Sequence, residues 1–368
     1  PDRDVKLLYD GLDRVSTATR GVFTSVPGSI TEGTTGSETW ALDALGNWAG
    51  FSFRAAGTTT SYSTTSTTQN QLIKISLGTT DIAVSAYDNE GNLVSVTRGT
   101  EVTQYKYDGW NRLVRVQQPP DNGDVKTTTH SYNALGWRTR QVVTSVNGMT
   151  TTPISDSSFT YNERWTVVEE RGTRAHATGD AATPFVDQQF WLPTGVDVPL
   201  MRHTWKWKAS SSSYESAGRV YQTTDVRGNV SMLLNETNGA PIQLMSYSPY
   251  GKQSRTLPGD INADGVVDDS DFQIFVAAYN DLICPAYPSR CPSDLNGDGM
   301  VDDTDFQQIF TVNYNYVAAP FRVSIGFGGY VADESTGLLL ARNRWYDSES
   351  GRWISQDPAG YVDGLNSY

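Results

Sequence analysis

The stretch YDNEGNLVSVTRG, Tyr87–Gly99, combines an aromatic residue and an aspartate with a short polar turn and a run of apolar and polar residues. The aspartate can cap the turn through its side chain, and glycine or asparagine supplies positive φ there. In Leu93–Val96 alternate positions place apolar side chains on one face of a strand. This stretch therefore predicts a β-hairpin.

The same unit recurs along the chain. Clear copies are YDGLDRVSTATRG from Tyr9, YKYDGWNRLVRVQ around Tyr107 and SYNALGWRTRQVV around Tyr132; weaker ones begin at Leu42, Asp225 and Tyr247. One hairpin cannot bury its aromatic residue alone, so the hairpins are expected to stack on their neighbours. The pattern predicts a mainly β fold built from repeated hairpins.

Composition agrees with a β protein and excludes some function classes. The 368 residues suffice for one large β domain or two to three ordinary ones, and tyrosine, tryptophan, threonine and serine favour strands. No apolar run is long enough for a membrane span, and no basic stripe supports nucleic-acid binding. The chain begins at Pro1 without a signal-peptide pattern, which suggests a piece of a longer protein whose localisation signal is not visible.

The C-terminal stretch GYVADESTGLLLARNRWYDSESGRWISQDPAGYVDGLNSY, Gly329–Tyr368, resembles the core signature of the RHS/YD-repeat proteins. The matching positions are Thr336-Gly337-Leu338, Arg342, Arg344-Trp345-Tyr346-Asp347, Gly351-Arg352-Trp353 and Gln356-Asp357-Pro358. Weaker YD similarity covers most of residues 1–257. The resemblance implies a large sheet curled into a shell, which in bacterial toxins often encloses a C-terminal effector and elsewhere belongs to surface or adhesion proteins.

The resemblance also implies self-cleavage by an aspartyl-protease-like centre, in which paired carboxylates activate water. Asp357 occupies the first Asp-Pro of that region, and the sequence ends before the second Asp-Pro-x-Gly segment of the family. Asp363 is the other nearby carboxylate downstream, and we do not assign it as the partner. The alternative is that Asp357 caps a turn before Pro358. We expect no enzymatic activity, with autoproteolysis left open.

Residues 258–317 hold eleven aspartates and one basic residue, Arg290, a formal net charge of −10 out of −13 for the whole chain. Two acidic loops, GDINADGVVDDSDF from Gly259 and SDLNGDGMVDDTDF from Ser293, place oxygen ligands at positions 1, 3, 5, 7, 9 and 12 of a calcium loop. The expected ligands of two calcium ions are Asp260, Asn262, Asp264, the Val266 carbonyl, Asp268 and Asp271, then Asp294, Asn296, Asp298, the Met300 carbonyl, Asp302 and Asp305. Val267 and Val301, at position 8, are expected to point inward.

Each loop precedes a short helical pattern, with Phe272, Phe275, Val276 and Tyr279 on one stripe after the first. Loop and helix, twice, resemble the type I dockerin module, whose folding would depend on calcium. Dockerins bind cohesins through positions 10 and 11. Here those pairs, Asp269-Ser270 and Asp303-Thr304, are acidic, so a cohesin-like partner is less favoured than another protein partner, self-assembly or an internal docking surface.

Cys284 and Cys291 lie between the acidic loops. They could form a disulfide, which would indicate an oxidising compartment, or remain unpaired thiols. The histidines, His130, His176 and His203, are distant in sequence, which disfavours zinc.

Three further stretches are ambiguous. Residues 57–70 and 209–216 could be flexible linkers, or for the first a threonine-rich strand, and the tryptophans of Phe185–Lys208 could pack in the core or stack on sugars.

We therefore predict three parts: a YD-repeat sheet over 1–257, a dockerin-like insertion over 258–317 and an RHS-associated core segment over 318–368. The main reading is an extracellular or cell-surface structural protein, a β scaffold whose calcium-stabilised module serves protein assembly. The first alternative is a fragment of an RHS toxin-delivery shell that encloses an effector and releases it by autoproteolysis. The second is a carbohydrate-binding scaffold component.

Overall fold

The fold is taken from a computed structural model that describes residues 4–23, 29–55, 57–175, 182–193, 195, 197–237, 239–262, 266–279, 293–295, 300–310, 324–360 and 366–368. Across these residues the protein is mainly β, as the sequence predicts, with one large antiparallel sheet that is not closed. No helix in the described part is long and apolar enough to cross a membrane.

Each strand of the large sheet pairs with its neighbours in sequence. Within the described residues the sheet has twenty strands. They are β1 (Asp4–Tyr9), β2 (Val15–Phe23), β3 (Ile30–Leu42), β4 (Trp48–Ala55), β5 (Thr58–Ser66), β6 (Leu72–Leu77), β7 (Thr80–Tyr87), β8 (Leu93–Arg98), β9 (Glu101–Tyr107), β10 (Leu113–Gln117), β11 (Val125–Tyr132), β12 (Arg138–Asn147), β13 (Thr150–Tyr161), β14 (Val167–Arg174), β15 (Thr183–Trp191), β16 (Pro199–Lys208), β17 (Ser213–Thr224), β18 (Val230–Asn235), β19 (Pro241–Tyr247) and β20 (Gln253–Thr256).

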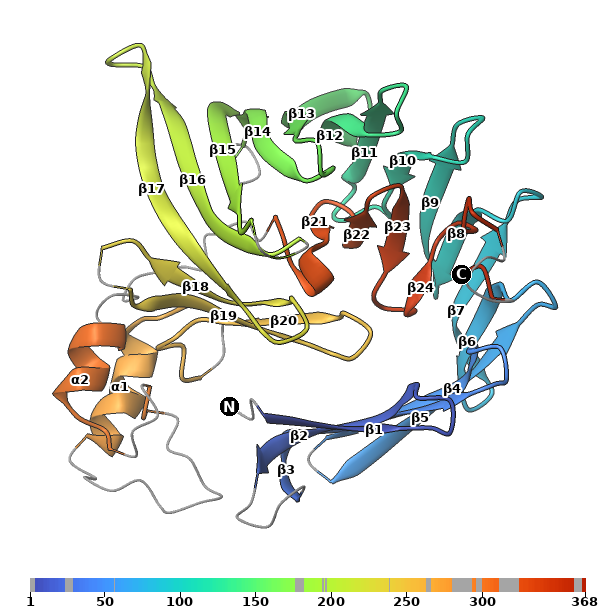
Figure 1. Cartoon of the computed structure of the whole chain (residues 1–368), viewed down its shortest axis with the longest axis horizontal. Helices are drawn as coiled ribbons and strands as arrows, with labels where there is room; N and C mark the ends of the chain where they lie inside the picture. The colour runs from blue at the N-terminus through green and yellow to red at the C-terminus, as the bar shows by residue number, and fades with distance from the viewer. Residues whose placement is uncertain are drawn as a thin grey trace.

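The sheet curls into an open wall, and a small second sheet lies on its concave side (Figure 1). The second sheet contains β21 (Val331–Asp333), β22 (Leu338–Ala341), β23 (Arg344–Asp347) and β24 (Arg352–Trp353). Side chains bring the two ends of the wall together: Arg20 on β2 donates to the carbonyl of Tyr247, and the Tyr250 hydroxyl donates to the Val15 carbonyl at 3.4 Å.

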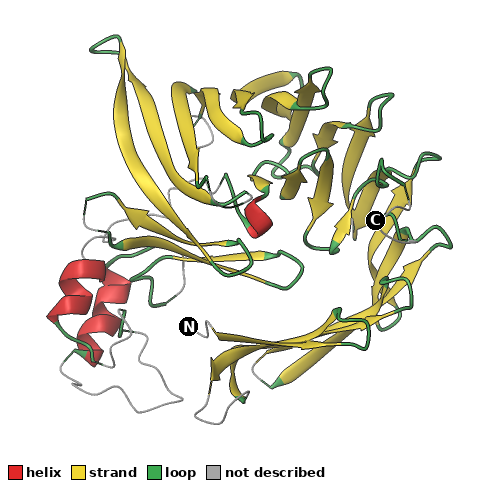
Figure 2. Cartoon of the chain, viewed as in Figure 1, coloured by secondary structure: helices red, strands yellow, loops and turns green. Residues whose placement is uncertain are grey.

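Two short helical segments lie outside the wall, beside β18–β20 (Figures 1 and 2). They are α1 (Asp269–Ala278) and α2 (Asp303–Asp305), the latter continued by a π-helical turn over Phe306–Phe310. Their small core contains Leu257, Val267, Phe275, Val301 and Phe310. Val267 and Val301 are buried, as predicted. The predicted stripe is wrong in part, because Phe275 is buried whereas Phe272 and Val276 are exposed.

The prediction that alternate residues of the repeat strands are buried on one face is wrong. In β8 the buried residues are Leu93 and Val96, three positions apart, and in β10 they are Leu113 and Val116. The strand pairing shifts register at these places, since Tyr87 pairs with Leu93 while Ala86 pairs with Ser95. Val94 is therefore the extra residue of a β-bulge, and it moves the following side chains to the other face.

The ambiguous stretches are largely ordered as wall. Residues 58–66 form β5, and residues 209–212 make the turn between β16 and β17. The Trp191 indole donates to the Val167 carbonyl at 2.8 Å and the Trp205 indole donates to Gln188 at 3.2 Å. The indole N–H groups of these two tryptophans are therefore used within the wall.

Candidate functional site

The capped turns of the repeat lie along one rim of the wall, where the odd-numbered strands turn back into the even-numbered ones. Because consecutive strands are antiparallel, these turns all lie at the same edge of the sheet. In the described chain nine of them share one geometry: the N–H of the first residue donates to the carbonyl four residues later. We call these turns the turn rim; they begin at Asp10, Asp43, Thr67, Asp88, Asp108, Asn133, Asn162, Asp225 and Ser248.

The side chain of the first residue caps each turn, as predicted from the repeat. Asp108 Oδ1 accepts the N–H groups of Trp110 and Arg112 at 3.0 and 3.1 Å, while Oδ2 accepts from Arg112 Nε at 2.8 Å. The fourth residue has positive φ, which is 58° at Asn111 and 84° at Gly91. Asparagine and glycine tolerate this left-handed backbone better than other residues.

Two turns of the rim were not predicted from the sequence. The turn from Thr67 uses a threonine hydroxyl as its cap and follows Ser66 rather than an aromatic residue. The turn from Asn162 has Trp165 at φ 64°, where glycine or asparagine is expected. Tyr161-Asn162 was the signal that could have revealed the second turn.

The repeat tyrosines join one hairpin to the next. Tyr132 donates its hydroxyl to the Leu113 carbonyl at 2.6 Å, Tyr161 to the Arg138 carbonyl at 2.9 Å and Tyr247 to the Val230 carbonyl at 2.9 Å. Each acceptor is the first residue after the preceding turn of the same kind. We call these hydroxyl contacts of Tyr132, Tyr161 and Tyr247 the Tyr ladder. Burial raises the pKa of Tyr161, so the hydroxyl keeps its proton and remains a donor.

Arginines of the C-terminal signature bind this turn rim. Arg352, which is buried, donates to the Asn70 carbonyl at 2.8 Å and to Asn47 Oδ1 at 2.7 Å. The Tyr368 hydroxyl donates to the Gly91 carbonyl at 2.8 Å. The C-terminal segment therefore donates hydrogen bonds to oxygen atoms of three turns, which holds neighbouring repeats together.

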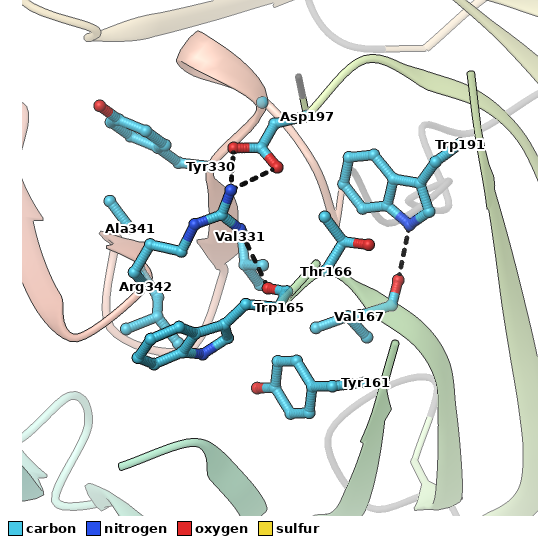
Figure 3. Close-up of a pocket in the computed structure, with 12 residues that line it drawn as sticks. Tyr161, Trp165, Thr166, Val167, Trp191, Asp197, Tyr330, Val331, Ala341 and Arg342 are labelled. Atoms are coloured by element: carbon cyan, nitrogen blue, oxygen red, sulfur yellow. Dashed lines mark hydrogen bonds and ion pairs between the residues drawn. The ribbon is translucent and has the colours of Figure 1, made fainter. Parts of the chain in front are cut away.

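Arg342 makes a comparable contact farther along the rim (Figure 3). Its Nη2 atom donates to both carboxylate oxygens of Asp197 at 2.9 and 2.8 Å, and Nη1 donates to the Trp165 carbonyl at 3.0 Å. Gly329 lies against the same loop with φ 72°, and a Cβ there would lie 2.2 Å from the Asp197 carbonyl oxygen. No other residue fits at that position without displacing the loop.

A buried polar cluster fixes β21 to the wall. Asp333 accepts from Gln141 Nε2 at 2.7 Å and lies 3.6 Å from Arg138 Nη1 and 3.8 Å from His130 Nε2. Burial lowers the pKa of His130 to about 3, so His130 is neutral at pH 7. The pKa of Asp333 is lowered as well: burial opposes ionisation, but the positive charge of Arg138 and the hydrogen bonds from Ser335 and Gln141 outweigh it. A buried Arg138–Asp333 pair therefore joins the two sheets.

Asp357, the catalytic candidate, lies at a cavity of about 710 Å³ whose lining also includes Trp110, Arg112 and Glu90. One carboxylate oxygen pairs with Arg344 Nη2 at 2.9 Å, and the other accepts the Ala359 N–H at 2.8 Å. Asp357 thus caps the turn Asp357–Gly360, which contains Pro358. Asp363 lies outside the described residues.

Both acidic loops show the same local geometry where the structure describes them. Asp268 and Asp302 are N-caps of the two helices, and each helix begins with a capping box. The fully buried Asp271 accepts the N–H groups of Ile261 and Asn262 on Oδ1, at 2.6 and 3.0 Å. In the second loop, buried Asp305 accepts the Leu295 N–H at 2.7 Å.

Several predicted ligands cannot be placed. Asp264, Asn296 and Asp298 lie outside the described residues, as do Cys284 and Cys291 of the expected disulfide and His176. Among the residues that are described, no group of three or more His, Cys, Asp or Glu side chains has metal-binding geometry. The calcium ligands and the disulfide therefore stay predictions.

Comparison with known proteins identifies the repeat. Residues 87–119, which run from the end of β7 through β10, match the family described as RHS Repeat. A double-stranded DNA deaminase toxin A of Burkholderia cenocepacia (strain H111) is 39% identical over 61 residues, which cover 17% of this chain and 4% of that protein. The toxin subunit YenC2 of Yersinia entomophaga is 54% identical over 35 residues, 10% of this chain and 4% of that subunit.

Among solved structures, the TcdB2-TccC3 crystal structure aligns with 98% of this chain and 21% of that one, at 14% identity and a TM-score of 0.27. The chain thus spans a small fraction of the length of the proteins it matches. The repeat match and the toxin relatives support the RHS/YD-repeat resemblance of the sequence.

Proposed function

We propose that this chain is a non-catalytic wall segment of an RHS toxin-delivery shell that encloses an effector polypeptide. The RHS repeat at 87–119, shared with proteins named as toxins, is the observation that carries the proposal. It favours this reading over a scaffold whose main purpose is dockerin-mediated assembly. An extracellular location and a protein partner follow from the same proposal.

The geometry of the wall suits enclosure. Hairpins pair in sequence order, so each repeat lengthens a curved wall with a concave inner face. The turn rim and the Tyr ladder fix each repeat to the next, and Arg352 and Arg342 tie the C-terminal segment across several turns. A wall held together by its own contacts can enclose a second polypeptide and does not need that polypeptide in order to fold.

Release of an effector by self-cleavage would require a second carboxylate beside Asp357. Glu90 is the other acidic residue on the described lining of that cavity. With both oxygens of Asp357 engaged by Arg344 and the Ala359 N–H, the arrangement favours turn capping, and we assign Asp357 a structural role.

For the acidic loops we propose two calcium ions as structural staples. The described carboxylates of these loops meet N–H and hydroxyl donors, and the sequence offers a single basic residue, Arg290, between 258 and 317. Hard oxygen ligands at loop positions 1, 3, 5, 7, 9 and 12 suit calcium, whose charge would relieve the repulsion between them. The module would then project from the wall between β20 and β21 and offer a surface to a protein partner.

The test uses the natural protein that contains this chain, expressed from its full reading frame with a C-terminal tag. We expect the tagged region to resist protease until the shell is denatured, and Asp357→Ala to leave any fragment pattern unchanged. A tag that is digested at once in the native protein, or a reading frame that encodes no effector, would contradict the shell.

A further inference from the structure

A second cavity, of about 260 Å³, lies on the concave face over β3–β5 and has no role in the wall described so far. Its lining includes Glu38, Trp40, Phe51, Phe53, Tyr62 and Tyr250. Strand register explains the grouping: Trp40 pairs with Phe51, which pairs with Tyr62, so these rings stand in a row on one face. The Phe51 and Tyr62 rings stack with centroids 4.8 Å apart.

Two residues of this lining each carry a buried polar atom that has no hydrogen-bond partner among the described residues. Trp40 is 6% exposed, yet its indole Nε1 donates to nothing, and Glu38 Oε2 is likewise unsatisfied. Buried indole N–H groups and carboxylates normally find partners, because leaving them unpaired is costly. One donor and one acceptor at the same cavity indicate a ligand that both accepts and donates hydrogen bonds.

The edge of the cavity carries both basic and acidic side chains. Lys252 on the turn before β20 pairs with Glu349 at 3.1 Å, and Arg98 lies on the lining as well. Glu38 has Arg20 among its electrostatic neighbours. With basic and acidic side chains of both wall and C-terminal segment present, the site favours a neutral polar ligand over a phosphate or a cation.

A sugar ring suits this lining, because its C–H face can pack on an aromatic ring while its hydroxyl groups can accept from the indole N–H and donate to the carboxylate. Phe53 lies on the lining and is 39% exposed. The C–H face of a pyranose carries slight positive charge, which is attracted by the negative face of an aromatic ring. The volume is slightly below the roughly 300–1,000 Å³ of common small-molecule sites, which limits the occupant to about one ring.

We propose that this cavity binds a single neutral pyranose ring, with one hydroxyl accepting from Trp40 Nε1 and another donating to Glu38. The site is a binding site and performs no chemistry. It is independent of the shell, because a wall segment with or without an enclosed effector presents the same cavity.

The experiment is saturation-transfer NMR and calorimetry of the 368-residue chain with the methyl glycosides of glucose, galactose, mannose and N-acetylglucosamine. We expect saturable binding of at least one. Trp40→Phe keeps the ring but removes the N–H, and should weaken binding roughly 2- to 10-fold. Phe53→Ala should weaken it by a similar factor. Trp207→Phe, on a 40% exposed ring of β16, is the matched control and should bind like the unchanged protein.

Far-ultraviolet spectra and denaturation curves of each variant establish that it is folded. The proposal is wrong if none of the four glycosides binds at ~10 mM ligand, far above the roughly millimolar Kd of a weak site, or if Trp40→Phe and Phe53→Ala both bind as the unchanged chain does. It is also wrong if a blocked Phe-Leu dipeptide binds with the expected sensitivity to Trp40→Phe while no glycoside does, since the cavity would then hold polypeptide.

Discussion

The β wall and the helical module satisfy their capping aspartates with different donors. On the wall, Asp10 and Asp108 each cap a turn and also pair with the arginine four residues later, at 2.6 and 2.7 Å. The hydrogen bond from Arg14 is the main reason why the pKa of Asp10 falls to about 2. In the module, Asp268 caps a helix with the Ser270 N–H and hydroxyl as its donors.

This difference in donors indicates that the two regions are stabilised by different interactions. The wall neutralises its acids with its own arginines and amides, and it buries its tyrosines against the next repeat. The module concentrates a formal charge of −10 between residues 258 and 317, with Arg290 as its one basic residue. We therefore expect the module, unlike the wall, to need a counter-ion from solution.

The largest effect should follow from breaking the buried pair in the wall. Asp333→Ala would leave Arg138 charged and buried, at a cost of about 3–5 kcal/mol in the free energy of unfolding. Chemical denaturation followed by tryptophan fluorescence measures it. Glu349→Ala removes a carboxylate from an exposed pair with Lys252 and is the matched control, expected to change stability by less than about 1 kcal/mol. Equal losses for the two variants would show that the buried pair does not join the sheets.

Calcium should affect the module and spare the wall. At a free ion concentration 100-fold above Kd, each ion would stabilise the module by about 2.7 kcal/mol. Hydrogen exchange with and without a chelator should therefore differ in α1 and α2 and agree in β1–β20. Asp260→Asn, at loop position 1, should reduce the difference, whereas Asp269→Asn, at the non-ligand position 10, should keep it. Unchanged exchange in α1 after chelation would disprove the ligand assignment.

Acid should destabilise the wall through His130. The unfolded histidine binds a proton near pH 6.5, whereas the buried one stays neutral until about pH 3, so the unfolded state holds more protons between these values. Stability is therefore full above pH 6.5 and falls as the pH is lowered, by about 2 kcal/mol from pH 7 to pH 5. Denaturation midpoints at several pH values test this. His130→Gln should flatten the curve in that window, and a curve as steep as the original would assign the effect to other groups.

Much of the wall could be predicted because the residues of the repeat determine the geometry of each turn. An aspartate after an aromatic residue, followed by glycine or asparagine, specifies a capped turn, and repetition specifies the stacking. Val94 and Val114 could not be placed, since a bulge that moves Leu93 and Val96 to one face leaves no mark in the apolar pattern. The partners of Arg352 and Arg342 were also out of reach, because they lie in turns more than a hundred residues away. The aromatic cavity was not predicted because it depends on strand register, which brings Trp40, Phe51 and Tyr62 side by side.

The smallest expected effect tests the Tyr ladder that distinguishes the wall from the module. Tyr161→Phe keeps the ring packed but removes the hydroxyl that donates to the Arg138 carbonyl at 2.9 Å. The net loss should be about 1 kcal/mol, because one buried hydrogen bond is exchanged for an unsatisfied carbonyl. Tyr214→Phe, on a 44% exposed ring of β17, is the control and should leave the denaturation midpoint unchanged. If Tyr161→Phe is as stable as the unchanged chain, ring packing alone joins the repeats and the hydroxyl contacts add nothing to the wall.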